Sequence, residues 1–261
     1  MSHSNGYIIG FAASVCVVCS VFVSGSAVSL RPKQQANQKL DLQQNVISVS
    51  GLTTEGTELT AEKVASLFAE DAADRVQPLY IDLKTGEVEN VEDMDAFAAT
   101  QKKMSAAEKC HALGKKENPA QIRCLPKKQE IFEVYKGGEL ERVILPIEGK
   151  GLWSTLKGFL ALNRDGNTVE GLTFYSHAET PGLGGEVDNP NWKAQWKGLK
   201  AYKDGSPAIT VRKGSAQDRT HEVDGLSGAT ITSVGVHNLA NFWLGDKGYG
   251  PYLTKMQKGG S

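Results

Sequence analysis

The clearest signal for the fold of this chain is EIFEVYKGGELERVILPI, residues 130–147. Two apolar-rich runs, residues 130–135 and 139–147, stand on either side of Gly137-Gly138. Glycine adopts the positive φ angles of tight hairpin turns without strain, so a glycine pair between such runs predicts a β-hairpin. This stretch therefore predicts two antiparallel strands.

Other segments extend this pattern along the chain. A second hairpin is predicted from GFLALN and VEGLTFYSH, with a turn at Asp165-Gly166-Asn167. Further elements are strands at residues 79–83 and 208–213, and helices at 191–199, at 230–244 and from a Thr60 cap to about Val76. Hairpins with interspersed helices indicate an α+β fold, with a largely antiparallel sheet and flanking helices.

An uncharged run of 24 residues, Tyr7–Leu30, lies near the N-terminus. A helix of this length is about 36 Å long, whereas the apolar core of a membrane is about 30 Å thick. We therefore expect a single transmembrane helix. The alternative is a cleaved signal peptide, because SGSA at residues 24–27 is typical of cleavage sites. The length of the run and the absence of a preceding Lys or Arg favour the retained helix.

The charged residues are balanced in number but unevenly distributed. The chain has 29 basic and 30 acidic residues and a net charge of −1, so no nucleic-acid partner is expected. Every Lys, Arg, Asp and Glu follows Leu30. The first basic residues are Arg31, Lys33 and Lys39, and by themselves they would place the following domain in the cytoplasm.

The four cysteines form two pairs. Cys16 and Cys19 share one face of the apolar helix, where they are packing residues or a thiol site shared with a partner helix. Cys110 and Cys124 flank a polar segment and would be able to form a disulfide outside the cytoplasm. No further Cys/His pair has zinc-ligand spacing, so no metal site is predicted.

Composition divides the chain into five segments. After the apolar run the sequence is polar and helix-prone, and residues 93–128 are charged without strand alternation, which indicates a helical insertion. The predicted segments are a tail at 1–6, a membrane helix at 7–30, a stalk at 31–50, an N-terminal part of the soluble domain with the insertion at 51–128, and the main domain at 129–258.

The stretch DGLSGATITS, residues 224–233, precedes the last predicted helix. Small and hydroxyl-bearing residues favour a helix N-terminus, so a plain capped helix is one interpretation. A helix N-terminus also attracts anions, because its first N–H groups lack partners and its dipole is favourable. A phosphate beside Thr230 is therefore the functional alternative. Ile231, Val234 and Phe242 are expected to contact the core.

The same stretch nearly matches the nucleophile elbow of hydrolases. Gly225-Leu226-Ser227-Gly228-Ala229 fits G-x-S-x-G except at its last position. The motif requires a strand before the serine and a later catalytic histidine. His237 is the one later histidine, and it falls on the same predicted helix, so hydrolysis by Ser227 is disfavoured.

Two glycine-rich stretches are further candidates for a binding site. ETPGLGGE, residues 179–186, matches neither a dinucleotide nor a nucleotide fingerprint. It is either a plain surface loop or a loop laid closely against a flat ligand. GKGLWS, residues 149–154, places Trp153 between glycines and a serine, as a core residue or as a platform for a ligand.

Taken together, these stretches resemble one family. The order of an apolar N-terminal helix, GKGLWS, ETPGLGGEVDNPNWKAQW, DGLSGATITS and FWLGDKGYGPYLTK is similar to that of the C subunits of Na+-translocating NADH:quinone oxidoreductases, the NqrC family. The most specific element is the flavinylation pattern D-x-x-[S/T]-G-A-[T/S], which the chain matches at Asp224, Ser227, Gly228, Ala229 and Thr230.

The resemblance implies a covalent flavin. In the family a flavin transferase links FMN through its phosphate to the last hydroxyl of the pattern, which corresponds to Thr230 and not to Thr232 or Ser233. The resemblance leads us to expect that Asp224, Ser227, Gly228 and Ala229 surround the phosphate and that the flavin lies against Glu179, Thr180, Leu183, Gly184 and Trp153. No acid–base pair is needed, and no catalytic residue is expected.

The resemblance also implies a place in a larger assembly. The expected role is a single-electron relay within a six-subunit oxidoreductase of the bacterial inner membrane that uses NAD and ubiquinone, with the B, D and E subunits as the main partners. Cys16 and Cys19 would lie near an iron–sulfur centre held by partner subunits. The soluble domain would face the periplasm, although the basic residues after the apolar run by themselves indicate the cytoplasm. Alternatives are the G subunit of the related Rnf complex and a membrane-anchored scaffold without flavin.

Overall fold

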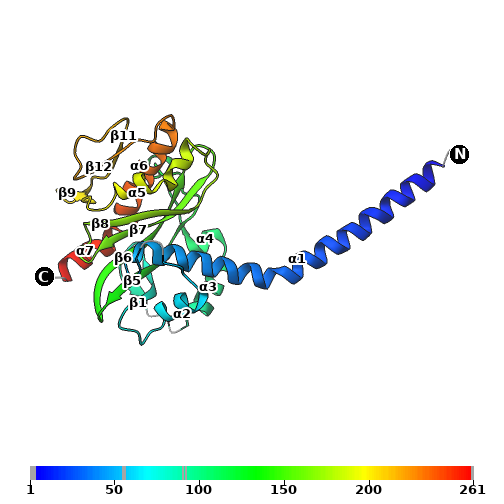
Figure 1. Ribbon diagram of the computed structural model, residues 1–261, viewed down its shortest axis with the longest axis horizontal. Coiled ribbons are helices and arrows are strands. Elements are labelled where there is room, and N and C mark those ends of the chain that lie inside the picture. Colours follow the sequence, from blue (N-terminus) through cyan, green and yellow to red (C-terminus); the bar gives the residue numbers. More distant parts are fainter. Residues whose placement is uncertain (1–3, 55–56, 90, 92, 260–261) are drawn as a thin grey trace. The chain divides into compact units, whose positions relative to one another are not determined.

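The computed structural model describes residues 4–54, 57–89, 91 and 93–259 (Figure 1). The chain divides into two compact units, Met1–Gln43 and Gln44–Ser261. Residues 1–3 of the predicted tail lie outside the described residues, as do residues 55, 56, 90 and 92 of the predicted segment 51–128.

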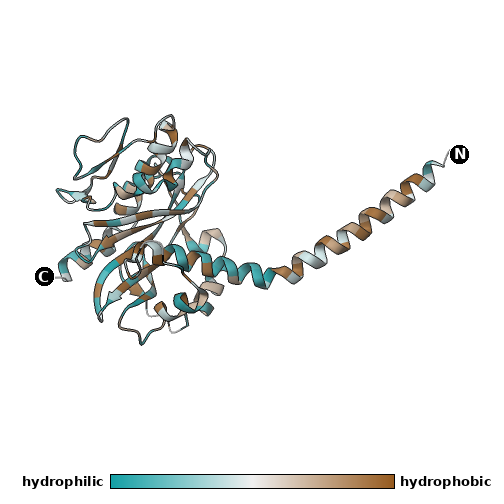
Figure 2. Ribbon diagram, viewed as in Figure 1, coloured by the Kyte–Doolittle hydropathy of each residue, from teal (hydrophilic) through white to brown (hydrophobic). Residues whose placement is uncertain are grey.

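The first unit consists of most of one long helix, α1 (Asn5–Ser50). Figure 2 shows its N-terminal part as predominantly hydrophobic. By length and composition α1 is able to cross a membrane, and it is the one helix of the described residues that meets this criterion. α1 continues through Pro32 without interruption. The predicted membrane helix and the predicted stalk therefore form one continuous helix.

The second unit begins within α1. Val46, Ile47 and Val49 near the end of the helix are buried, and Arg142 from the sheet donates a hydrogen bond to the Val49 carbonyl. The last carbonyls of a helix lack intrahelical partners, and a cation beside them is favourable. The last turns of α1 therefore belong to the packed domain, although residues 31–50 were predicted to be a stalk.

The centre of the second unit is a sheet of six antiparallel strands, which matches the predicted fold class. Both predicted hairpins are confirmed, with turns at Gly137-Gly138 and around Gly166, where φ is positive. The strands lie in the order β2 (Val88–Glu89), β1 (Arg75–Asp82), β5 (Lys128–Lys136), β6 (Glu139–Lys150), β7 (Thr155–Asn163) and β8 (Val169–Ser176).

Both faces of this sheet are buried. Successive side chains of a strand point to opposite faces. Val143 and Leu145 of β6 therefore join the large core that contains α5, α6 and α7, whereas the intervening Ile144 is buried outside that cluster. On this second face Phe132 lies edge-on to both Phe68 and Phe159. The double burial explains why β7 is almost continuously apolar.

The N-terminal part of the second unit contributes two strands of the sheet, β1 and β2, and a helical excursion. Thr60 caps α2 (Ala61–Leu67) as predicted, but the helix ends before Phe68 instead of at Val76, because residues 75–82 pair with β5. The excursion contains α3 (Met94–Lys103), α4 (Ala106–Lys109), β3 (Cys110–His111), η1 (Lys115–Glu117) and β4 (Leu125–Pro126).

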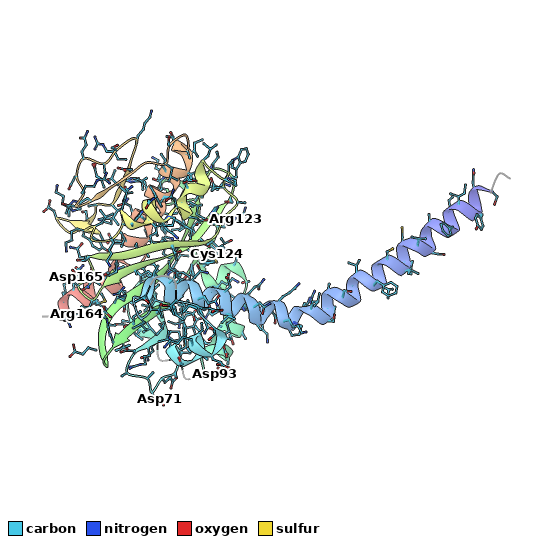
Figure 3. The ribbon with its side chains drawn as sticks, viewed as in Figure 1. Asp71, Asp93, Arg123, Cys124, Arg164 and Asp165 are labelled. Atoms are coloured by element: carbon cyan, nitrogen blue, oxygen red, sulfur yellow. A yellow bond between two sulfur atoms is a disulfide. The ribbon has the colours of Figure 1, made fainter. Side chains whose placement is uncertain are left out.

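A disulfide closes this excursion. Cys110 and Cys124 are bonded across 14 positions of sequence, with their Cα atoms 5.3 Å apart; Cys124 is labelled in Figure 3. Within the closed loop Ala120 is buried, and its carbonyl accepts the N–H of Lys150 at 2.8 Å. The disulfide loop therefore supports the end of β6.

The C-terminal part covers one face of the sheet with short elements and two longer helices (Figure 1). The predicted strand at 208–213 exists as β11, but it pairs in parallel with β12 outside the main sheet. The predicted helix at 191–199 is shorter, and α7 had not been predicted. The elements are η2 (Gly184–Asp188), α5 (Pro190–Ala194), β9 (Tyr202–Lys203), β10 (Ser206–Pro207), β11 (Thr210–Arg212), β12 (Glu222–Asp224), α6 (Thr230–Leu244) and α7 (Gly250–Gly259).

Candidate functional site

Glycines bring α6 into direct contact with the end of β6. A Cβ atom at Gly235 of α6 would collide with the Lys150 carbonyl, and one at Gly149 would lie 2.6 Å from the Leu239 Cβ. Side chains larger than hydrogen would separate the two backbones. The first turn of α6 is thereby held next to the loop of residues 151–154, which joins β6 to β7.

The Glu179 carboxylate connects this loop to α6. Its Oε1 atom accepts the N–H groups of Trp153 (3.0 Å) and Ser154 (3.1 Å) and the Ser154 hydroxyl (3.0 Å). Its Oε2 atom accepts the Leu152 N–H (3.1 Å) and the Thr232 hydroxyl (2.7 Å). Two segments that are distant in sequence are thus joined through one carboxylate.

Glu179 is 5% exposed and is nevertheless stabilised as an anion. Burial by itself would raise the pKa of its carboxyl group, because it disfavours the charged form. The hydrogen bonds from Thr232, Ser154, Trp153 and Leu152 favour the carboxylate and more than offset burial, so the pKa lies below its ordinary value. The side chain is therefore a structural anion.

The loop after β8 is shaped around the same carboxylate. The Thr180 carbonyl accepts the N–H groups of Leu183 (3.1 Å) and Gly185 (2.9 Å), and Gly182 takes the positive φ of 75° that this turn requires. A Cβ at Gly184 would lie 2.6 Å from the Thr232 hydroxyl oxygen. The loop therefore passes tightly over the first turn of α6 and leaves Leu183 exposed.

Hydroxyl groups at the start of α6 differ sharply in accessibility. Thr230 is exposed, whereas Thr232 is fully buried and donates to Glu179. Ser233 is also buried; its hydroxyl accepts the Leu226 N–H and donates to the Ala229 carbonyl. Of the three hydroxyl side chains in this first turn, only that of Thr230 is exposed.

In the part of the chain that the structure describes, the N-cap residue of α6 makes no side-chain capping hydrogen bond. This residue is Ala229, which offers no side-chain acceptor to the first N–H groups. Gly228 takes a φ of 70°, and a Cβ there would lie 2.9 Å from a methyl carbon of Leu183. A helix start that is uncapped, glycine-lined and next to an exposed hydroxyl is suited to bind a phosphate group.

Exposed apolar side chains lie on the segments that meet at this helix start. Outside α1, six large hydrophobic side chains of the described residues are exposed, and one of them is Val88 of β2. The other five lie on the 151–154 loop, on the loop after β8 and on α6. These five form the apolar rim: Leu152, Trp153, Leu183, Ile231 and Val234. Solvent-exposed apolar clusters of this kind mark binding sites in soluble domains.

Two members of the rim correct the predictions made from sequence. Ile231 and Val234 were expected in the core, but they are 58% and 50% exposed. Thr232, Ser233 and Val236 supply the buried face of the helix instead, because the Glu179 carboxylate provides a partner for a buried hydroxyl. Trp153 is 67% exposed, so it is not a core residue, and a platform for a ligand stays a prediction.

Asp224 does not point toward the helix start. Its carboxylate accepts the Ala216 N–H and pairs with Arg219 at 2.9 Å, while its carbonyl accepts the indole N–H of Trp192. These contacts secure the preceding loop and α5 behind the motif. Asp224 therefore supports the site from one side instead of lining it.

The remaining predicted site residues fall into two groups. Ser227, Gly228, Thr180 and Leu183 are exposed near the helix start, whereas Ala229, Gly184 and Glu179 are buried beneath it. Ser154 and Thr232 were not predicted to be partners of Glu179. Both belong to motifs that the sequence had made prominent, but Thr232 and Glu179 are separated by 53 positions, and no local signal connects them.

The geometry also bears on hydrolysis by Ser227. The one histidine after it, His237, lies on α6, and its ring contacts the Asn241 side chain at 3.4 Å. Burial lowers the pKa of His237. No hydrogen bond between His237 and Ser227 occurs among the described residues, so the elbow arrangement is not assembled.

The fold and the site together define an FMN-binding domain. Residues 151–245 match the FMN-binding domain family, and this range contains the rim, Glu179 and the start of α6. The residues present fit the group: the uncapped helix start suits a phosphate, and the apolar rim suits a flat aromatic ring.

Whole-chain relatives specify the family further. The chain is 45% identical to the C subunit of the Na(+)-translocating NADH-quinone reductase of Vibrio alginolyticus over 254 residues, which cover 96% of this chain and 94% of that protein. For the corresponding subunit of Pseudomonas aeruginosa the identity is 42%, over 95% of this chain and 94% of that protein. The crystal structure of Shewanella oneidensis NqrC has a TM-score of 0.73 at 30% identity, covering 85% of this chain and 99% of that one. The chain belongs to the NqrC family, the C subunits of the Na+-translocating NADH-quinone reductases.

Proposed function

We propose that this chain is the FMN-carrying subunit of a Na+-translocating NADH-quinone reductase and that it holds FMN covalently on Thr230. The observation that carries the proposal is the exposed Thr230 hydroxyl at an uncapped helix start, beside the apolar rim. The neighbouring hydroxyls of Thr232 and Ser233 are buried and already bonded. Thr230 is therefore the acceptor that this arrangement favours.

Attachment would be a phosphoryl transfer to the Thr230 oxygen. Thr230 Oγ would form the P–O bond and release its hydroxyl proton to solvent. The flavin transferase breaks a phosphoanhydride bond of an activated flavin nucleotide, and the other phosphate leaves with the electron pair. The first N–H groups of α6 and the Ser227 hydroxyl would neutralise part of the phosphate charge.

The rim residues orient the ring of the cofactor. Trp153, Leu152 and Leu183 offer exposed apolar surface next to the helix start. Bound FMN would supply the capacity to accept and donate electrons, which none of these side chains possesses. A covalent tether keeps the local concentration of the cofactor high, so the rim serves orientation more than affinity.

The proposed place of the subunit follows from the family. α1 anchors the chain in the bacterial inner membrane through residues 7–30, and the soluble domain faces the periplasm. The subunit passes single electrons between redox centres of its neighbours, with the B, D and E subunits as partners. Cys16 and Cys19 are both exposed on α1 and would lie near an iron–sulfur centre held by partner subunits. The disulfide between Cys110 and Cys124 is consistent with the periplasmic side.

A denaturing gel tests the covalent link. The protein is produced with its flavin transferase, denatured and inspected for ultraviolet fluorescence in the protein band. We expect a fluorescent wild-type band, loss of fluorescence in Thr230→Ala, and retention in Thr230→Ser. Thr232→Ala should also retain it. A dark wild-type band, with the transferase active on a control substrate, would refute the proposal.

A further inference from the structure

Glu179 is unusual for its burial. Among the residues that the structure describes, it is the one Asp, Glu, Lys, Arg or His side chain that is buried. All five groups that donate to it are neutral: three backbone N–H groups and two hydroxyls. Its negative charge is therefore solvated by oriented dipoles and is not cancelled by a cation.

The surrounding backbone is fitted to this charge. A Cβ at Gly151 would lie 2.6 Å from Oε1, and one at Gly184 would lie 2.9 Å from Oε2. Three consecutive N–H groups, those of Leu152, Trp153 and Ser154, converge on the carboxylate while the Leu152 and Trp153 side chains face solvent. The charge thus lies directly behind the apolar rim.

We propose that Glu179 is the positioning residue of the flavin site, which fixes the 152–154 loop against the first turn of α6 and lowers the reduction potential of the flavin through its buried charge. The inference rests on the proposed function. From the sequence, Glu179 was expected to touch the flavin, but its carboxylate is fully used beneath the rim. It acts through the loop and through its electric field.

The electrostatic effect has a definite direction. A negative charge behind the ring opposes the arrival of an electron, and the low dielectric of a buried site weakens the interaction less than water does. The substitution Glu179→Gln removes the charge and nearly preserves the shape. It also turns an NH2 group toward N–H donors, so the loop loses part of its support.

The experiment compares Glu179→Gln with Glu186→Gln. Glu186 lies on the same loop, is partly exposed and accepts a hydrogen bond from Asn189 at 2.7 Å, which makes it a matched control. The flavin midpoint potential and the visible circular dichroism of the bound flavin are measured in each flavinylated protein. We expect a raised potential and an altered spectrum in Glu179→Gln, and wild-type values in Glu186→Gln.

A second measurement does not depend on flavin. In Thr230→Ala protein, which carries no flavin, adding Glu179→Gln should speed hydrogen exchange at the amides of Leu152, Trp153 and Ser154 by about tenfold or more. Thr232→Val, which removes one donor and keeps the charge, should alter the visible spectrum without raising the potential. Together these variants separate the positioning role from the charge.

The outcomes are distinct. Wild-type potential and spectrum in a flavinylated Glu179→Gln protein would overturn the inference while leaving the proposed function intact. Unchanged amide exchange would overturn the positioning role even if the variant bound no flavin. A wild-type protein without covalent flavin would overturn the proposed function; the exchange measurement would then still decide whether Glu179 holds the loop.

Discussion

The candidate flavin site has an inner and an outer half, built from the same short motifs. In the inner half Glu179, Thr232 and Gly184 are buried and mutually bonded or in close contact. In the outer half Thr230 and Trp153 are exposed. Thr230 and Thr232 are two positions apart in one helix, but one is exposed and the other buried, because they lie on opposite sides of its first turn. Membership of a motif therefore does not show whether a residue meets the ligand or supports those that do.

The largest expected difference between the halves concerns stability. Glu179→Ala leaves five donors in a buried space without their acceptor, so we expect the free energy of unfolding to fall by about 3 kcal/mol or more. Chemical denaturation of the soluble unit measures it. Thr230→Ala, in the outer half, should change it by less than about 0.5 kcal/mol. Equal losses of unfolding free energy in Glu179→Ala and Thr230→Ala would contradict the division into an inner and an outer half.

The disulfide loop supports the inner half from another side. Reduction, or Cys110→Ser with Cys124→Ser, removes a closure of 14 residues, and the chain-entropy estimate is about 3 kcal/mol. Because Ala120 in this loop accepts the Lys150 N–H, amide exchange should rise at Lys150 as well. Free thiols in the oxidised wild-type protein would contradict the pairing.

The pH dependence of stability should follow Glu179. Its pKa is lower in the folded than in the unfolded protein, so its contribution is complete above the unfolded pKa of about 4.3 and is lost as the pH falls through the folded pKa. Denaturation between about pH 6 and pH 3 should show a steeper fall for wild type than for Glu179→Gln. If stability fell equally with pH in both proteins, another titrating group would control the pH dependence.

The smallest effect on stability is expected in the outer half at Trp153. Its side chain is 67% exposed, so Trp153→Ala should alter the free energy of unfolding by less than about 0.5 kcal/mol. The visible circular dichroism of the flavin should nevertheless change, because the ring loses a neighbouring surface. A Trp153→Phe variant serves as the conservative control. A strongly destabilised Trp153→Ala protein would place this side chain in the inner half.

The parts of the fold that were predicted correctly depend on local signals. Alternation and glycine turns identified the two central hairpins, and α6 begins and ends where its pattern indicated. The errors occurred where distant contacts decide. Ile231 and Val234 resemble core residues by type, but the partner that turns the helix toward Thr232 is Glu179, 53 residues away. Similarly, β11 pairs in parallel with β12, and a parallel pair is not made by a hairpin turn that a local signal could mark.

The sequence named candidate site residues but not their arrangement. Resemblance and composition pointed to Glu179, Trp153 and Thr230 without showing which of them face solvent. That division depends on glycines such as Gly235 and Gly184, which allow backbones to touch. A glycine in a sequence is compatible with a turn, a close approach or plain flexibility, so packing alone reveals its use.

The buried end of α1 determines where the water-soluble portion of this protein can be cut. A fragment that starts after Ser50 would lack Val46, Ile47 and Val49, whose burial contributes about 5 kcal/mol in total by typical transfer values. It would also remove the carbonyl to which Arg142 donates. Cleavage near Gln43 keeps these turns and removes the exposed apolar helix, so a protease site or an expression start belongs inside the helix rather than at its end.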